Sequence, residues 1–308
     1  MTTPGFILGE ATAAERIARD RLTFEAWGGR LTREQYLDRE RFLRQTDHGR
    51  LAMHTWVLRV PNGVVMASCE TFRLPLMPTG AVEVIATVYV DPPLRGAKMA
   101  SRLIDALVAQ RREAGLDGLV LFSEVGPELY ARSGFKPLPA FTRDWAAATS
   151  PPDPGAGLIH AAELPEALAW RERLRATEIE LRLVHHLFDW HHARSRFYSR
   201  VLNQPLTEVL GARVSGVQAL WAPDFVAGVL RVLDVTGPAG ASLDPVMAVA
   251  SSEAAAVGLP KVELWDDSLS RQLVGGRPAG TGEDVPMGLA FSPRGELFLG
   301  PLSRACWA

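Results

Sequence analysis

Cysteine is scarce in this chain, with only Cys69 and Cys306 among 308 residues. Two cysteines far apart in sequence provide neither a disulfide framework nor a cysteine-based metal cluster, so we expect a protein of the reducing cytoplasm. Long apolar runs are also missing, so we expect no transmembrane helix. Residues 1–20 lack the basic start and apolar stretch of a signal peptide, so none is expected.

Charge of one sign is not in excess either. The formal net charge is −2, so the composition gives no reason to expect nucleic acid or an anionic membrane as a partner. Hydrophobic residues make up 47% and charged residues 22%, an ordinary globular balance. The length suits one large domain or two ordinary ones.

The hydrophobic pattern of the first half alternates between helical and strand-like periods. Thr32 is placed to cap a helix, and Pro61-Asn62-Gly63 is typical of a hairpin turn. A β-branched run indicates a central strand, and an amphipathic helix follows it, with Gly115 at its end. The predicted elements are helical residues 11–50, strands 54–60, 64–72 and 83–90, helix 98–114, strand 118–122 and a short helix 127–133.

A Pro- and Gly-rich segment, residues 149–157, reads as a linker. We therefore predict domains 1–148 and 158–308. The second half repeats the element order of the first, which indicates a degenerate second copy and a mixed-sheet α/β protein. Its predicted elements are helices 164–175 and 179–202, strands 217–222 and 229–235, helix 244–257 and strand 262–265.

Residues 88–101, VYVDPPLRGAKMAS, place a short turn between a strand and a long helix. The first amides of a helix lack partners within it and carry partial positive charge, so such an end binds phosphate. Gly96 and the small residues Ala97 and Ala100 allow a diphosphate to approach the backbone. Arg95 can add a charge-assisted hydrogen bond.

This segment resembles the cofactor motif of the GNAT acetyltransferase superfamily, Arg/Gln-x-x-Gly-x-Gly/Ala, with Lys98 in place of the middle glycine. The Lys98 amide can still donate if its φ is ordinary. Residues 123–135 resemble the later motif of that superfamily, with Tyr130 ahead of Gly134-Phe135. The resemblance implies a GNAT fold with a second, degenerate GNAT-like lobe.

The resemblance also implies an N-acetyltransferase that uses acetyl-CoA. The strand that ends at Val90 would leave its neighbour and bind the pantetheine arm, and an amine would attack the thioester directly. Tyr130 would act as the acid, or would pack there and bind the sulfur. The residues expected at the cofactor are Val88, Tyr89, Val90, Arg95, Gly96, Ala97, Lys98, Met99, Ala100, Ser101 and Ser123.

An amine acceptor must lose a proton before it attacks, so a carboxylate or a water relay is needed as base. Glu83 lies where members of the superfamily often carry a catalytic glutamate. Glu70 and Glu124 are alternatives. The terminal carboxylate of Ala308 is a further one, because the apolar end RACWA is suited to docking and some two-lobed relatives use their terminus as a base.

Residues 183–200 carry four histidines. His185, Asp189 and His192 share a helical face, but there is no further histidine or cysteine cluster and no HExxH order, so we expect no metal site. The open interpretations are a helix that lines an acceptor pocket with Trp190, His191 and Arg194, or simply a packed helix.

This helix and the segments 221–225, 230–233, 253–254 and 262–265 resemble the C-terminal lobe of the fungal lysine N6-acetyltransferase family, and residues 31–37 and 68–71 resemble its N-terminal part. The resemblance implies L-lysine as acceptor, with Arg194 or Arg231 on its carboxylate and Glu70 among the substrate contacts. Another amine, a polyamine, an aminoglycoside or a protein lysine, stays open, as does a non-catalytic acyl-CoA binder. So does the oligomeric state.

Overall fold

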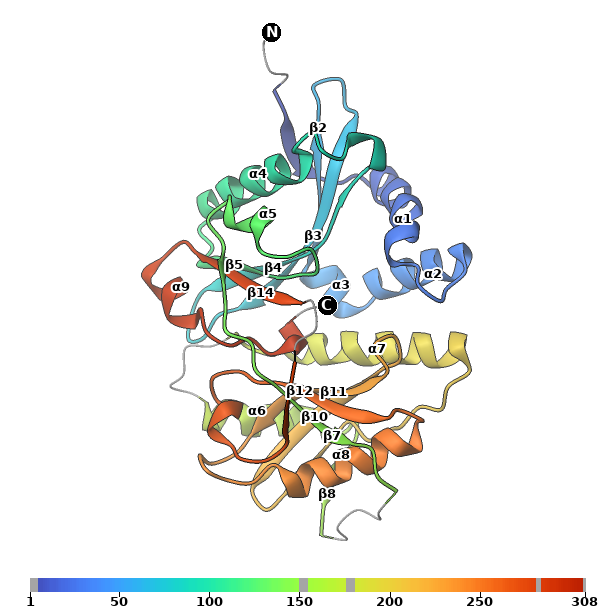
Figure 1. Cartoon of the computed structure of the whole chain (residues 1–308), viewed down its shortest axis with the longest axis vertical. Helices are drawn as coiled ribbons and strands as arrows, with labels where there is room; N and C mark the ends of the chain where they lie inside the picture. The colour runs from blue at the N-terminus through green and yellow to red at the C-terminus, as the bar shows by residue number, and fades with distance from the viewer. Residues whose placement is uncertain (1–4, 150–154, 176–180, 281–283, 307–308) are drawn as a thin grey trace.

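The computed structural model describes residues 5–149, 155–175, 181–280 and 284–306. Two seven-stranded sheets follow one another along the long axis of the molecule, and the long helix α7 (His185–Leu202) lies between them (Figure 1). Among the described strands, the pairs are antiparallel except for β4–β5 in the first sheet and β11–β12 in the second. Both sheets are therefore mixed, and the predicted α/β class is confirmed.

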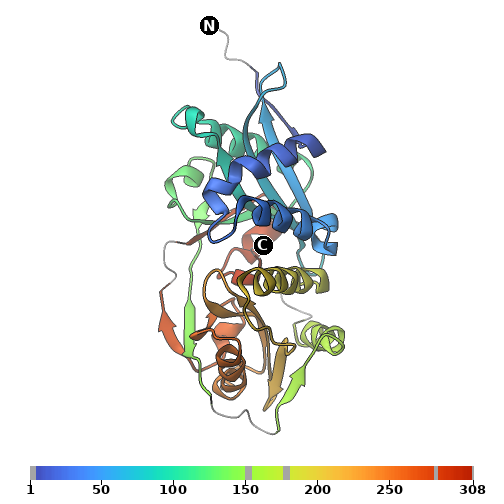
Figure 2. The same cartoon turned by 90° about the vertical axis from the view of Figure 1, so that its right-hand side faces the viewer.

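The first sheet has the strand order β1-β2-β3-β4-β5-β14-β6. Helices α1–α3 cover one face, and α4 and α5 lie on the other (Figures 1 and 2). The bounds are β1 Ile7–Glu10, α1 Ala13–Trp27, α2 Arg33–Arg44, α3 Asp47–Leu51, β2 Met53–Arg59, β3 Val65–Pro75, β4 Ala81–Val90, η1 Pro92–Leu94, α4 Met99–Glu113, β5 Gly118–Ser123, α5 Glu128–Ala131, β6 Lys136–Pro137 and β14 Val285–Ala290.

The second sheet has the order β13-β7-β12-β11-β10-β9-β8. Helix α8 packs on one face, and α6 and α7 lie on the other (Figure 1). The bounds are β7 Thr142–Ala146, β8 Gly157–Ile159, α6 Leu164–Leu174, β9 Gly211–Val214, β10 Val217–Asp224, β11 Val229–Thr236, α8 Asp244–Ala256, β12 Lys261–Trp265, η2 Ser270–Gln272, β13 Arg277–Ala279, α9 Pro293–Phe298 and η3 Arg304–Cys306.

The two halves of the chain exchange strands. Strand β7 precedes the predicted linker but pairs with β12 in the second sheet, whereas β14 returns from the second half to pair with β5 in the first. The chain passes from one sheet to the other between β6 and β7, not within residues 149–157, of which 150–154 lie outside the described part. The division of the chain into domains at the linker stays a prediction. It does not coincide with the boundary between the two sheets.

Local sequence accounts for the elements that frame the site. Thr32 caps α2 and forms a reciprocal capping box with Gln35, as its N-cap position predicts. On α4, the apolar face predicted from periodicity is buried against the first sheet. Helix α7 begins at His185 rather than at residue 179, and residues 176–180 are not described. No helix within the described ranges is both long and apolar enough to cross a membrane.

Candidate active site

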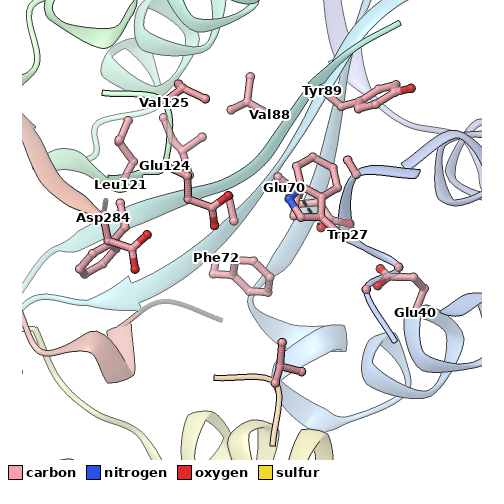
Figure 3. Close-up of a pocket in the computed structure, with 18 of the residues that line it drawn as sticks. Trp27, Glu40, Glu70, Phe72, Val88, Tyr89, Leu121, Glu124, Val125 and Asp284 are labelled. Atoms are coloured by element: carbon pink, nitrogen blue, oxygen red, sulfur yellow. Dashed lines mark hydrogen bonds between the residues drawn. The ribbon is translucent and has the colours of Figure 1, made fainter. Parts of the chain in front are cut away.

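A cavity of about 1200 Å³ lies between the two sheets. Its walls come from the α1–α2 turn, β3, β4, the loop before α4, α5 and, across the gap, α7, β11 and the C-terminal turn η3. Figure 3 shows Glu70, Phe72, Glu124 and Asp284 around this space. Because both halves of the chain contribute to the walls, a ligand in the cavity contacts the first and the second domain together.

Strand β4 leaves its neighbour β5 beside this cavity. The registered pairs of these strands run from Val82 with Gly118 to Ile85 with Leu121 and stop there, while β4 continues to Val90. On its other side the register of β4 with β3 shifts, and Thr87 adopts a left-handed backbone with φ of 49°. The predicted divergence of the strand end is present, and its backbone is available to a ligand in the gap.

The loop between β4 and α4 faces the same cavity. Gly96 has φ of 84°, and an added Cβ there would meet open space. Lys98 caps α4 with φ of 59° and ψ of 25° and no side-chain hydrogen bond to the helix. The condition of an ordinary φ at Lys98 is therefore not met: the residue adopts the left-handed conformation that a glycine would take without strain.

Tyr130, on α5, lines the cavity and is 7% exposed. Burial, with smaller contributions from Cys69 and Glu124, raises the pKa of Tyr130 to about 12. The phenol is thus protonated at neutral pH and can donate a hydrogen bond to a ligand beside it.

Glu83, the predicted base, lies elsewhere. Its side chain is 1% exposed, faces α4 and accepts a hydrogen bond from Arg111 Nη1 at 3.3 Å. It is not among the residues that line the cavity. Glu83 lies on the side of the sheet that α4 covers, in the part of β4 that still pairs with β5, and this position keeps it from the cavity.

Glu70 lines the cavity but is already occupied by partners. Its Oε1 accepts from Arg19 Nη1 at 3.0 Å and Arg44 Nη2 at 2.7 Å, and its Oε2 accepts from Thr87 Oγ1 at 2.8 Å. Burial alone would raise the pKa of Glu70, but Arg19 and Arg44 outweigh it and hold the pKa below its ordinary value. A carboxylate stabilised in this way is a weak base and suits a structural role.

Asp20, Glu40 and Glu70 offer oxygens within 4.8 Å of one another, the spacing of a cation site. Arg44 donates to Asp20 and Glu70, and its Nη2 lies 3.4 Å from Glu40 Oε2. These ion pairs account for the cluster without a metal.

Glu124, the other alternative, follows β5 directly and faces the cavity. Figure 3 shows its carboxylate and that of Asp284 pointing into the same part of the space. Burial and the charge of Asp284 raise the pKa of Glu124, while Arg304 acts in the opposite direction. Arg304 Nη2 lies 3.3 Å from Asp284 Oδ2. Of the three glutamates considered, Glu124 is the one that both lines the cavity and has its pKa raised.

The second domain closes the cavity with arginines and aromatic rings. Asp224 lies 3.2 Å from Arg194 Nη1 and 3.4 Å from Arg231 Nη2, and Arg231 Nη1 donates to Glu263 at 2.7 Å. Trp190 packs edge-on against Phe72, with ring centroids 5.4 Å apart. Helix α7 therefore lines the cavity, which supports the first of its two sequence interpretations.

The histidines of α7 do not form one cluster. His185 pairs with Asp189 at 2.9 Å on an exposed face, whereas His192 is buried with 6% of its surface exposed. His191 shares a hydrogen bond of 2.9 Å with the carbonyl of Ala305. This bond holds the turn η3 at the cavity. Ala308, the alternative terminal base, lies outside the described residues.

The cavity collects most of the predicted site residues and several that the sequence did not reveal. Asp224 belongs to a segment with a family resemblance, whereas Asp284 and Arg304 lie where no motif marked them. The predicted residues that line it are Glu70, Val88, Tyr89, Val90, Arg95, Gly96, Lys98, Met99, Ala100, Ser101, Glu124, Tyr130, Trp190, His191, Arg194 and Arg231. Glu83, Ala97 and Ser123 are not among them, and the Ser123 hydroxyl donates to the carbonyl of Gly126 at 2.6 Å.

Comparisons with known proteins match both halves. Residues 17–135 match the model described as Acetyltransferase (GNAT) family, and residues 150–277 match that of the LYC1 GNAT-like C-terminal domain. The chain therefore contains a GNAT acetyltransferase domain and a second, GNAT-like domain, and the predicted enzyme class, an acyltransferase, is confirmed. No curated protein matches the sequence significantly.

Solved structures share the fold of this two-domain GNAT protein at low identity. A GCN5-related N-acetyltransferase from Anabaena variabilis is 14% identical, with 94% of this chain and 73% of that one covered and a TM-score of 0.58. One from Kribbella flavida is 13% identical, with 93% and 72% covered and a TM-score of 0.55. Eis1 from Mycobacterium abscessus is 14% identical, with 93% and 74% covered and a TM-score of 0.53.

Proposed function

We propose that this GNAT protein transfers the acetyl group of acetyl-CoA to a primary amine, and that the preferred acceptor is the side-chain amine of L-lysine. One observation carries the proposal. The end of β4, which no longer pairs with β5, lies beside Tyr130 and Glu124 at a cavity that the second domain closes with arginines.

The first domain would hold the cofactor. Its diphosphate would lie at the N-terminus of α4, against the amides and cations of residues 95–101. The pantetheine arm would lie between the separated ends of β4 and β5 and hydrogen-bond to the backbone of Val88 and Val90. This arrangement brings the thioester to Tyr130 and Glu124.

The transfer itself needs two proton movements. Glu124 takes a proton from the acceptor ammonium and later releases it to solvent, and the free amine nitrogen bonds to the thioester carbon. As the carbon–sulfur bond breaks, the nitrogen loses a second proton, which ends on the coenzyme A sulfur. A phenol with pKa of about 12 is a weaker acid than a thiol, whose usual value is about 8.5, so Tyr130 stabilises the departing thiolate as a hydrogen-bond donor.

The charges of the cavity favour an amino acid over a polycation. Basic side chains outnumber acidic ones along the walls, which would repel a polyamine or an aminoglycoside. Glu124 and Asp284 offer carboxylates to an ammonium group, and Arg194 or Arg231 can bind a carboxylate. The basic residues are Arg30, Arg39, Arg44, Arg95, Lys98, Arg132, Arg194, Arg231 and Arg304, and the acidic ones are Glu40, Glu70, Glu124, Asp224 and Asp284.

An acceptor panel tests the proposal. Thiol release from acetyl-CoA is measured with L-lysine, with cadaverine, which is lysine without its carboxylate, and with spermidine. We expect kcat/KM for lysine to exceed that for cadaverine by about 100-fold, because cadaverine lacks the carboxylate that Arg194 or Arg231 would bind. Equal or better rates with cadaverine or spermidine would overturn the lysine assignment.

A further inference from the structure

Thr87 is the most unusual backbone position in the wall of the cavity. Its φ of 49° lies in the left-handed region, where a β-branched residue is a steric outlier. Such conformations persist only where the surroundings impose them, and they concentrate at functional sites. The contacts that hold Thr87 therefore bear on what this strand does.

The strain coincides with a β-bulge. At the register shift between β3 and β4, the single residue Cys69 faces two residues of β4, Thr87 and Val88. An extra residue bends a strand and increases its twist, and it redirects the residues beyond it. Those residues lead to Val90, along the stretch that has left β5.

Arg19 of α1 hydrogen-bonds to the bulge from the side away from the cavity. Its Nη2 donates to the Thr87 hydroxyl at 2.7 Å and to the Thr87 carbonyl at 3.2 Å, and its Nη1 donates to Glu70 at 3.0 Å. Glu70 accepts in turn from the Thr87 hydroxyl. Arg19 is 4% exposed and is not among the residues that line the cavity, whereas Thr87 and Glu70 are.

The bond to the carbonyl fixes a peptide plane. In a trans peptide the N–H of the next residue points opposite to the C=O, so the Val88 amide points away from Arg19. We propose that Arg19 is a positioning residue for acyl transfer, which holds Thr87 so that the Val88–Val90 backbone stays turned toward the cofactor. This role rests on the proposed function of the cavity.

Glu70 also takes part in the hydrogen bonds that hold Thr87. Arg44 donates to the same Glu70 oxygen as Arg19, so the carboxylate stays paired when Arg19 is replaced. Substitution of Arg19 thus removes the bonds to Thr87 without leaving Glu70 as an isolated buried charge.

The test compares Arg19→Met with Arg59→Met. Arg59, on β2, also ties α1 to the first sheet, through Glu15 at 2.6 Å, but within the described part of the chain its guanidinium does not hydrogen-bond to Thr87. We expect Arg19→Met to lower kcat for acetyl transfer by about 100-fold, as a displaced reacting group does. Coenzyme A affinity, governed by the loop at α4, should change less than threefold, and Arg59→Met should keep both values.

Thr87 supplies a second pair of variants. Thr87→Ser keeps the hydroxyl and should retain most activity, whereas Thr87→Val has the same shape without it and should lose activity like Arg19→Met. Equal kcat for the wild type and a folded Arg19→Met, or an equal loss in Arg59→Met, would overturn the proposal.

Hydrogen exchange separates this proposal from the proposed function. Acetyl-CoA should slow amide exchange over residues 88–90 in the wild type, and this protection should be lost in Arg19→Met whether or not any amine is acetylated. Protection that is the same in both proteins contradicts the role of Arg19. A wild type that shows the protection but acetylates no amine contradicts only the transfer reaction.

Discussion

Glu124 and Glu83 are glutamates of the same domain with opposite surroundings. Glu124 faces the cavity, whereas Glu83 is buried against Arg111. We predict that Glu124→Gln lowers kcat by about 100-fold, the usual contribution of a general base, and that Glu83→Gln leaves kcat unchanged while lowering thermal stability.

The pH dependence of kcat provides a second readout for Glu124. A base works in its ionised form, so activity should fall as pH falls through the pKa of Glu124, which lies above the ordinary value of glutamate. This fall in activity at low pH should be absent from the residual activity of Glu124→Gln. An unchanged profile in that variant would contradict the assignment.

Lys98 has a left-handed backbone at the start of α4. Glycine adopts this conformation without the clash of a Cβ, so Lys98→Gly should raise the free energy of unfolding by about 1 kcal/mol, measured by denaturant titration. The same variant should weaken coenzyme A binding, because a cation that lines the cavity is lost. A Lys98→Gly variant that is less stable than the wild type would contradict the claim that the backbone at Lys98 is strained.

At the scale of single residues, the sequence predicted the turn before α4 and a short helix that carries Tyr130, because both depend on local order along the chain. It did not predict which carboxylate faces the cavity. Glu83 points to the α4 side of β4, whereas Glu124 lies just beyond the end of β5 at the cavity, and which way each points depends on exact strand bounds and register. Asp284 and Arg304 reach the site only through tertiary packing.

At the scale of elements, the exchange of β7 and β14 ties the two sheets together. Strand β5 is buried along its length, and it pairs with β14 on the edge opposite to the one that pairs with β4. The sequence predicted β4, α4 and β5 from strong periodicity. It did not predict β14, whose six residues Val285–Ala290 include a proline and a glycine and gain their stability from the partner strand.

We predict that a fragment of residues 1–148 does not fold on its own. It lacks β14, which leaves the apolar edge of β5 open, and its own β7 has no partner. Circular dichroism and sedimentation should show an unfolded or aggregated fragment, while the full chain melts in one transition. A monomeric fragment with a cooperative melt would contradict the coupling of the two sheets.

At the scale of the molecule, one apolar cluster spans both domains. It runs from Phe72 in the first sheet through Trp190 on α7 to Leu220 and Leu233 in the second. His48 lies in this region, stacked on Phe72 with 2.8 Å between its Nδ1 and that of His186. Neutral imidazoles are therefore part of the contact between the domains.

Buried histidines make the stability depend on pH. Burial lowers the pKa of His48 to about 3, of His191 to about 4 and of His192 to about 3, from an ordinary value of about 6.5. Between pH 3 and pH 6.5 these histidines bind protons in the unfolded chain but not in the folded protein. Their contribution to the free energy of unfolding is therefore complete above about pH 6.5 and is lost as pH falls toward 3.

We therefore expect the melting temperature to fall as the pH is lowered from 7 to 5, and His48→Gln to show a weaker fall over the same range. The variant His185→Gln is a matched control, because His185, which pairs with Asp189 on α7, is an exposed histidine rather than a buried one. An identical pH dependence in His48→Gln and the wild type would contradict this account.

Thiol release from acetyl-CoA, measured over a panel of amines for the wild type and Tyr130→Phe, tests the central claim most directly. We predict amine-dependent release by the wild type, greatest with L-lysine, and a fall in kcat of about 100-fold in Tyr130→Phe with little change in KM for acetyl-CoA. The account is contradicted if acetyl-CoA binds, no amine is acetylated and Tyr130→Phe behaves like the wild type.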